Sequence, residues 1–196
     1  MSRISGLNKS RDHEEEVLKD AALKEHRFKD LAVMLVHCSE NARCMRFHAP
    51  GIPDSLFKRG EMPMTKRNIR ALIASKLEVG DTDTVLDIGA GTGGVSIELS
   101  MLAGKVIAVE RDATELLSEN KRRFGAWNLD IIKGEAPEAL YAGRIRDEGI
   151  DKGFIGGSGG RLRDILLYIH KNYPEAPICF TAILFETLAG GGALLE

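Results

Sequence analysis

The stretch that most constrains the fold is residues 84–94, which reads TVLDIGAGTGG. Its first five residues are apolar or β-branched apart from Asp87, and this pattern predicts a buried strand. Glycines at alternate positions, Gly89, Gly91 and Gly93, then open a helical pattern. Glycine can turn at positive φ and has no Cβ to hold a ligand away. The stretch therefore predicts a strand, a ligand-contacting loop and a helix.

Two nucleoside cofactors fit such a loop. Gly89, Gly91 and Gly94 also satisfy the dinucleotide pattern G-x-G-x-x-G, in which a pyrophosphate binds at the helix N-terminus. Asp87 separates the two, because a carboxylate beside the loop repels a pyrophosphate and attracts the ammonium and sulfonium of S-adenosylmethionine. We therefore expect S-adenosylmethionine. The loop residues assigned to it are Asp87, Gly89, Ala90, Gly91, Thr92 and Gly93.

Two further acids follow predicted strands. Glu110 ends the run 105–109, about 20 residues past the glycines, where an acid at a strand tip can accept the ribose hydroxyls. Its neighbour Arg111 is assigned to the same site. Glu135 follows the run 129–132, and with the backbone of Ala136 it is placed to bracket an adenine.

From residue 65 onward, strand and helix patterns alternate. We predict strands at 84–88, 105–109, 129–132, 152–155 and 178–181, with helices from Thr65 (as cap), at 93–102, at 112–124 behind an Asp112 capping box, and at 161–171. The first helix should bury residues 69, 72, 73 and 77. This order predicts an α/β fold with a doubly wound, mostly parallel, Rossmann-like sheet of the class I methyltransferase type. The chain ends before the closing antiparallel strands of that class, so the fifth strand is expected to be an exposed edge.

Residues 1–50 have a different character. A short helical pattern at Val17, Leu18, Ala21 and Ala22 predicts a helix, and the runs 31–37 and 42–47 predict a hairpin. Residues 50–53 then form a Pro- and Gly-rich linker. We therefore expect an N-terminal appendage over 1–50 and a cofactor-binding domain over 51–196.

Composition excludes several classes. With 43% hydrophobic and 29% charged residues and a net charge of −2, the chain has no general basic field for nucleic acid, no bilayer-spanning apolar run and no signal peptide. Its three cysteines form no C-x-x-C pair, which fits the cytoplasm. The group His37, Cys38, Cys44 and His48 matches no common zinc spacing, so no metal is expected.

Several segments together resemble a known family. They are GIPDSLF at 51–57, MPMTK at 62–66, DIGAGTG at 87–93, GEAPEAL at 134–140 and FIGGSGG at 154–160. The chain resembles the decarboxylating cobalt-precorrin carbon-15 methyltransferases of cobalamin biosynthesis. Residues 31–51 resemble the last part of the carbon-5 methyltransferase module, so the chain looks like a fragment of a fused precorrin-6Y methyltransferase.

The resemblance implies an activity and its partners. The expected reaction is methylation at ring carbon 15 with loss of carbon dioxide from a ring acetate, and the expected partners are a tetrapyrrole substrate, a homo-oligomer and a carbon-5 module. Thr65, the glycine loop, Glu110 and Ala136 would surround S-adenosylmethionine. Thr181 departs from the family's usual Asn. No catalytic side chain is assigned, because in-line methyl transfer mainly needs alignment and shelter from water.

The substrate carries many carboxylates, so anion-binding groups near the strand ends are candidates for contacting it. Those assigned are Lys66 and the possible backbone nest of Gly156, Gly157, Ser158, Gly159 and Gly160. Three alternatives stay open: a methyltransferase acting on RNA or protein, an NAD-dependent oxidoreductase, and a non-catalytic assembly fragment.

Overall fold

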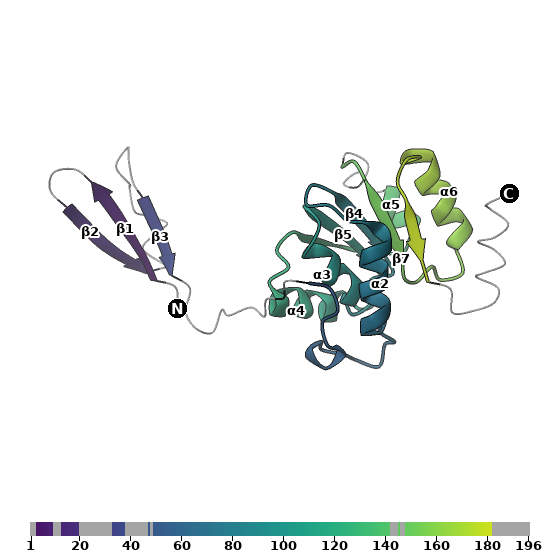
Figure 1. Ribbon diagram of the computed structural model, residues 1–196, viewed down its shortest axis with the longest axis horizontal. Helices are drawn as coiled ribbons and strands as arrows, with labels where there is room; N and C mark the ends of the chain where they lie inside the picture. The colour runs from purple at the N-terminus through teal and green to yellow at the C-terminus, as the bar shows by residue number, and fades with distance from the viewer. Residues whose placement is uncertain are drawn as a thin grey trace. The chain divides into compact units, whose positions relative to one another are not determined.

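The computed structural model describes residues 3–9, 13–19, 33–37, 47, 49–141, 145 and 148–181, the first three ranges by backbone only. The chain divides into two compact units, Met1–Cys44 and Met45–Glu196, and each is described by itself. The prediction that the chain ends before the closing antiparallel strands concerns residues after 181, which lie outside the described residues. Figure 1 shows the chain from its N-terminal strands to its C-terminal helix α6.

The first unit corrects the predicted helix. Strands β1 (Arg3–Lys9), β2 (His13–Lys19) and β3 (Val33–His37) form an antiparallel sheet in the order β2-β1-β3. Val17 and Leu18, expected in a helix, therefore lie in β2, whose backbone pairs with β1 along its whole length. A helix of so few residues is marginal by itself, and strand pairing takes its place. Strand β3 pairs with β1. Residues 42–46 of the predicted hairpin lie outside the described residues, so the hairpin stays a prediction.

The second unit confirms the doubly wound parallel sheet. Its strands are β4 (Thr84–Ile88), β5 (Lys105–Glu110), β6 (Leu129–Lys133), β7 (Lys152–Ile155) and β8 (Ile178–Phe180). All pairs are parallel and the order is β6-β5-β4-β7-β8, so the strand order reverses beside β4. A crevice at such a reversal is where doubly wound sheets bind ligands. Strand β8 is an edge of the sheet among the described strands, as predicted.

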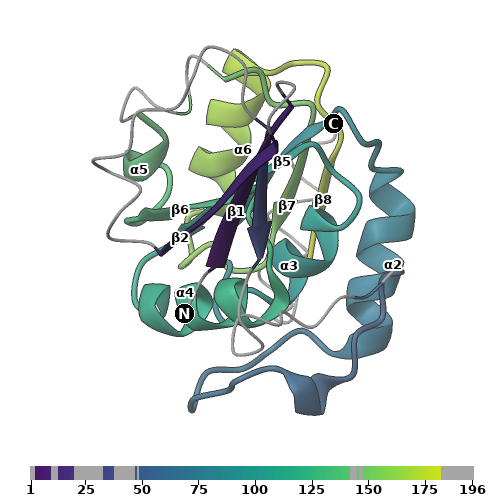
Figure 2. The same cartoon turned by 90° about the vertical axis from the view of Figure 1, so that its left-hand side faces the viewer.

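Helices cover both faces of this sheet. They are α2 (Arg67–Leu77), α3 (Gly94–Ser100), α4 (Thr114–Phe124), α5 (Glu138–Tyr141) and α6 (Leu162–Asn172), with a 3-10 turn at Asp54–Leu56. Helices α2, α3 and α4 share one hydrophobic core with the sheet, and α5 and α6 share the other. Figure 2 shows the two groups of helices on opposite sides of the sheet.

Strand alternation decides which residues meet at the site. Val85 packs in the core under α2, α3 and α4, whereas Leu86 and Ile88 pack in the opposite core. Side chains of a strand point alternately to the two faces, so Asp87 lies on the Val85 side. The same alternation in β5 puts Glu110 on that side too. Both acids therefore lie under α3 and α4.

The helix starts correct two predicted caps. Lys66 and Ala113 occupy the N-cap positions of α2 and α4, and neither helix has a side-chain cap bond. Asp54 Oδ1 instead accepts the N–H of Arg67 at 3.0 Å, in place of the predicted cap Thr65. In place of an Asp112 cap, Glu110 Oε1 accepts the N–H of Asp112 at 2.8 Å. Acceptors distant in sequence, or on the preceding strand, satisfy the free N–H groups.

The buried face of α2 also differs from the prediction. Ile69 and Leu72 were expected to be buried but are 42% and 51% exposed. The buried residues are Arg70, Ile73, Ala74 and Leu77. The true face is rotated by about one residue because a fully buried arginine replaces an apolar residue in the helical spacing.

Candidate cofactor site

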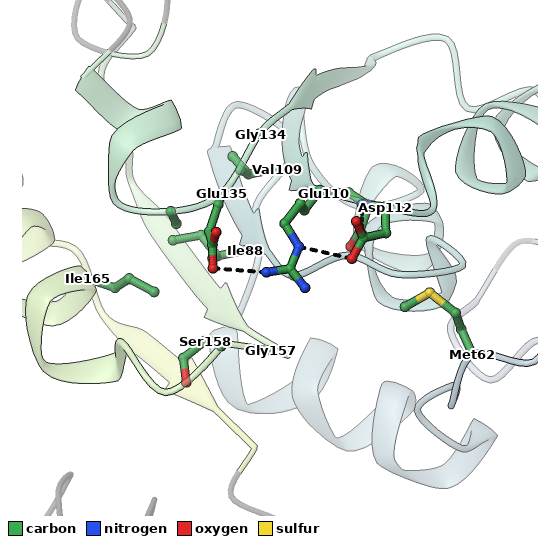
Figure 3. Close-up of a pocket in the computed structure, with 14 residues that line it drawn as sticks. Met62, Ile88, Val109, Glu110, Asp112, Gly134, Glu135, Gly157, Ser158 and Ile165 are labelled. Carbon is green, nitrogen blue, oxygen red and sulfur yellow. Dashed lines mark hydrogen bonds and ion pairs between the residues drawn. The ribbon is translucent and has the colours of Figure 1, made fainter.

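Two adjoining cavities lie where the parallel strands end. The first, about 180 Å³, is lined by the tips of β4, β5 and β6 and by the loop after β7, and it includes Glu110, Arg111, Glu135 and Ala136. The second, about 410 Å³, includes Thr65, Lys66, Asp87, the glycine loop and Thr181. Gly89 lines both. Figure 3 shows the first, with Glu110, Asp112 and Glu135 at the strand ends and Ser158 across from them.

Two glycines of the loop have no room for a side chain. Gly89 has φ of 72°, and a Cβ there would lie 2.4 Å from the carbonyl oxygen of Gly157. Gly93 has φ of 81°, and its Cβ would lie 2.1 Å from Leu117 Cδ1. The glycine loop therefore packs backbone to backbone against the loop after β7 and closely against α4. Any side chain at either position would force these elements apart.

Asp87 is a fully buried acid with one oxygen unpaired. Ser96 of α3 donates a hydrogen bond to Oδ2, and Oδ1 is the buried side-chain oxygen or nitrogen without a partner among the described residues. Burial raises the pKa of Asp87 to about 7; the bond from Ser96 opposes this rise, and the charge of Glu110 adds to it. A buried acceptor without a donor is costly, and it marks where a ligand donor belongs. The ammonium of S-adenosylmethionine fits this requirement.

Glu110 holds the loop and also faces the first cavity. Its Oε2 accepts the N–H of Gly91 at 2.8 Å, and Oε1 accepts the N–H groups of Asp112 and Ala113 at 2.8 and 3.1 Å. A carboxylate has about four acceptor positions, so three bonds leave capacity for a hydroxyl. The ribose contact stays a prediction that this geometry allows. Glu110 has in addition a structural role, holding the glycine loop, that the sequence did not reveal.

The rim of the first cavity carries an ion pair. Arg111 donates from Nε to Asp112 at 2.9 Å and from Nη1 to Glu135 at 3.1 Å, linking the ends of β5 and β6. Arg111 and Asp112 are exposed, Glu135 is half-buried and Ala136 is buried. Exposed ion pairs contribute little stability, so this contact leaves the rim adjustable.

The wall formed by residues 62–66 rests on a buried ion network that sequence reasoning missed. Arg70 donates to Glu98 Oε1 at 2.8 Å, to Asp54 Oδ1 at 2.7 Å and to the carbonyl of Thr65 at 2.6 Å. It also donates to the carbonyl of Ile52 and lies 4.8 Å from the ring centre of Phe57. Glu98 in turn accepts the N–H groups of residues 51 and 52, so the predicted linker is firmly held. The sequence signal for the burial of Arg70 is the helical spacing of residues 70, 73, 74 and 77.

The loop after β7 is only partly free to bind an anion. The N–H groups of Gly156 and Gly157 both donate to the carbonyl of Ile88, at 2.8 and 3.3 Å. The backbone nest suggested by composition therefore cannot include those two N–H groups. Gly157, Ser158 and Gly159 line the first cavity and Gly156 the second, whereas Gly160 lines neither.

The described residues show neither a metal-binding cluster nor a membrane-spanning helix. Within those ranges no three His, Cys, Asp or Glu side chains come together to hold a metal. Four residues were predicted not to form a metal site: His37, Cys38, Cys44 and His48. Only the backbone of His37 lies in the described part. No helix in the same part is long and apolar enough to cross a membrane.

The fold and this site together define a Rossmann-like methyltransferase. The glycine loop has an acid near the end of each of the strands β4 and β5, and the charge of Asp87 would repel a pyrophosphate. A model of the precorrin methyltransferase domain matches residues 55–189. The chain belongs to the precorrin methyltransferase family, which confirms the resemblance seen in the sequence.

Individual relatives of the chain carry names from the same family. A probable cobalt-precorrin-6B C(15)-methyltransferase (decarboxylating) of Saccharolobus solfataricus is 40% identical, over 75% of this chain and 76% of that protein. The Salmonella typhimurium cobalt-precorrin-6B C(15)-methyltransferase (decarboxylating) is 43% identical, over 69% and 70%.

Solved structures agree as well. The precorrin-6Y C5,15-methyltransferase of Geobacter metallireducens superposes with a TM-score of 0.68 at 34% identity, covering 74% of this chain and 79% of that one. The precorrin 8W decarboxylase of Methanobacterium thermoautotrophicum also gives 0.68, at 36% identity and coverages of 74% and 78%.

Proposed function

We propose that this chain binds S-adenosylmethionine in the two adjoining cavities and methylates carbon 15 of a cobalt-precorrin-type tetrapyrrole, with decarboxylation of a ring acetate. The observation that carries the cofactor part is the unpaired Oδ1 of Asp87 beside the glycine loop. The substrate part is supported by relatives at 40–44% identity that bear the C(15)-methyltransferase name. Both parts concern the same end of the sheet.

Each cavity is assigned a different part of the cofactor. In the first, Glu110 accepts a ribose hydroxyl, and Glu135 and Ala136 border the base. In the second, Asp87 accepts the ammonium, and the open backbone at Gly91, where a Cβ would meet nothing within 4 Å, lets the amino-acid part approach closely. NAD fits less well, because the carboxylate of Asp87 beside the glycine loop opposes a pyrophosphate.

The chain contributes alignment and shelter rather than an acid or base. When bound, S-adenosylmethionine supplies an electrophilic methyl group on sulfur. Met64, Val95 and Phe154 give the second cavity an apolar wall that excludes water, and Lys66 at its edge pairs with a substrate carboxylate. The conjugated macrocycle itself accepts the electrons released with carbon dioxide.

The wider parts of the proposal rest on the resemblance alone. They are a homo-oligomer, a carbon-5 methyltransferase module fused to or associated with this chain, and residues 1–50 as the remnant of that module. A location in the cytoplasm is proposed from the composition and the cysteine pattern instead.

The test has two stages. Calorimetry of the full chain with S-adenosylmethionine and, separately, with NAD is expected to give saturable binding of the first only. Incubation with S-adenosylmethionine and cobalt-precorrin-6B, followed by mass spectrometry, should show a product that has gained a methyl group and lost carbon dioxide; a mixture without S-adenosylmethionine is the control. Saturable NAD binding with no S-adenosylmethionine binding contradicts the cofactor assignment. Cofactor binding without any change in the tetrapyrrole contradicts the substrate assignment.

A further inference from the structure

Asn120 of α4 is a fully buried amide that lines neither cavity. Its Oδ1 accepts the N–H of Lys58 at 2.8 Å, and its Nδ2 donates to the carbonyl of Lys58 at 2.9 Å. Nδ2 also donates to the carbonyl of Thr92 at 2.9 Å. An amide group has two N–H donors, so both are used. The side chain is thus fully committed to the backbone of two distant segments.

The two segments joined by Asn120 form opposite parts of the site. Thr92 belongs to the glycine loop and lines the second cavity. Lys58 begins the segment that continues into Met62, which lines the first cavity, and into residues 63–66, which line the second. By bonding both the N–H and the carbonyl of Lys58, Asn120 fixes two successive peptide groups, as a neighbouring strand would.

The surroundings of Asn120 make this contact rigid. Leu117, one turn earlier on α4, packs against Gly93 of the glycine loop. Phe124, one turn later, stacks on Phe57 with ring centres 4.6 Å apart. One face of α4 therefore touches the glycine loop at one end and the Lys58 segment at the other, with Asn120 between them.

We propose that Asn120 is a positioning residue that couples the glycine loop to the wall formed by residues 62–66. The inference rests on the proposed function, because its consequence is the alignment of cofactor and substrate. Without the amide, each segment keeps its own anchors, such as Glu110 for the loop and Arg70 for the wall. What is lost is their fixed relation, and methyl transfer depends strongly on such alignment.

The chain offers a matched control in Asn128. This half-buried amide also donates from Nδ2 to backbone carbonyls, those of Ser100 at 3.0 Å and Ala103 at 2.9 Å. These contacts lie where β5 and β6 begin, at the end of the sheet opposite the cavities. Asn128→Ala therefore removes a similar kind of bond without touching the site.

The experiment measures unfolding by urea, S-adenosylmethionine affinity by calorimetry, and kcat and KM for the tetrapyrrole in Asn120→Asp, Asn120→Ala and Asn128→Ala. Asp has nearly the size of Asn but no N–H donor when ionised. We expect both Asn120 variants to lose about tenfold or more in cofactor affinity and to lower kcat, because small displacements of the groups that align the reactants are costly. Asn128→Ala should lose stability with affinity and kcat unchanged. Equal affinity and kcat in the Asn120 variants and the wild type would overturn the inference.

A second measurement needs no variant. Hydrogen exchange of the wild-type chain should show that S-adenosylmethionine slows exchange of the Lys58 amide, although Lys58 lines neither cavity. Unchanged exchange at Lys58 in a protein that binds the cofactor overturns the coupling while leaving the proposed function standing. If the wild-type chain does not bind S-adenosylmethionine, the proposed function fails first.

Discussion

Arg70 and Asp87 are both charged and both wholly buried, yet they differ in how their charges are satisfied. Arg70 has two carboxylates, two carbonyls and an aromatic ring around its guanidinium. Asp87 has one hydroxyl donor and an oxygen with no partner. The first arrangement is complete without a ligand and the second is not.

The difference separates a structural charge from a binding charge. A buried ion is tolerated when opposite charges and hydrogen bonds surround it, and removing a partner is then costly. A buried acid without enough donors instead shifts toward its neutral form, as the raised pKa of Asp87 indicates. The following predictions test this contrast, starting with the largest effect.

Arg70→Ala should have the largest effect, and it should be on folding. Removing one partner of a buried ion pair destabilises a protein by about 3–5 kcal/mol, because the charge of Glu98 is left uncompensated. Urea unfolding measures this loss. The control is Lys76→Ala, an exposed position of the same helix, which should change the free energy of unfolding by less than about 0.5 kcal/mol. A loss at Arg70 as small as that at Lys76 would contradict the structural role.

Asp87→Asn should give the opposite pattern. The amide keeps the size of the side chain but removes the charge, so binding of S-adenosylmethionine should weaken by about 1.5–3 kcal/mol, the range for bonds to charged groups. Unfolding of the ligand-free protein at pH 8 should need at least as much urea as the wild type, because a buried charge is gone. An affinity equal to that of the wild type would remove Asp87 from the binding site.

Glu110→Ala should weaken cofactor binding by about 1–3 kcal/mol, the cost of leaving polar groups unpaired. The change removes the ribose acceptor and frees the N–H of Gly91, so the loop loses an anchor as well. Calorimetry measures the effect, with the exposed Glu115→Ala of α4 as the control that keeps its affinity. Unchanged affinity in both variants would exclude the ribose contact.

The smallest predicted effect on cofactor affinity is the pH dependence that Asp87 gives it. Its pKa is about 7 in the folded chain against an ordinary 3.8, so the folded state holds more protons between these values and its stability falls as pH rises from about 4 to about 7. Above about 7 this contribution is constant. Cofactor affinity moves the other way and should rise about tenfold from pH 6 to pH 8 as the carboxylate ionises. Subtracting the values for Asp87→Asn isolates both trends, and a difference that does not change with pH would contradict them.

The sequence predicted the elements whose signals are local. The strand β7 and the start of β4 fall where the apolar runs and turn residues place them, and the glycine loop is recognisable from its spacing alone. The site elements that were missed depend on distant residues. Asp54 reaches the start of α2 from 13 residues away, and Asn120 meets Lys58 across 62.

Some local signals also misled. Residues near 17 have a helical pattern but form a strand that pairs with β1. Pairing with a separate segment cannot be predicted from a few neighbouring residues. Arg70 was not among the residues expected to be buried, because single-residue hydropathy does not show that Glu98 and Asp54 surround it. Asp87 was predicted from the sequence to be the acid that selects the cofactor, and its unpaired oxygen became visible only with the fold.

The most direct test of the central claim compares two ligands that share adenosine and sulfur. S-adenosylmethionine has the ammonium that Asp87 is proposed to bind, and 5′-methylthioadenosine lacks the whole amino-acid part. Calorimetry at pH 8 should show that Asp87→Asn weakens S-adenosylmethionine by about 1.5–3 kcal/mol and leaves methylthioadenosine unchanged. Equal losses for both ligands, or none for either, would contradict the account.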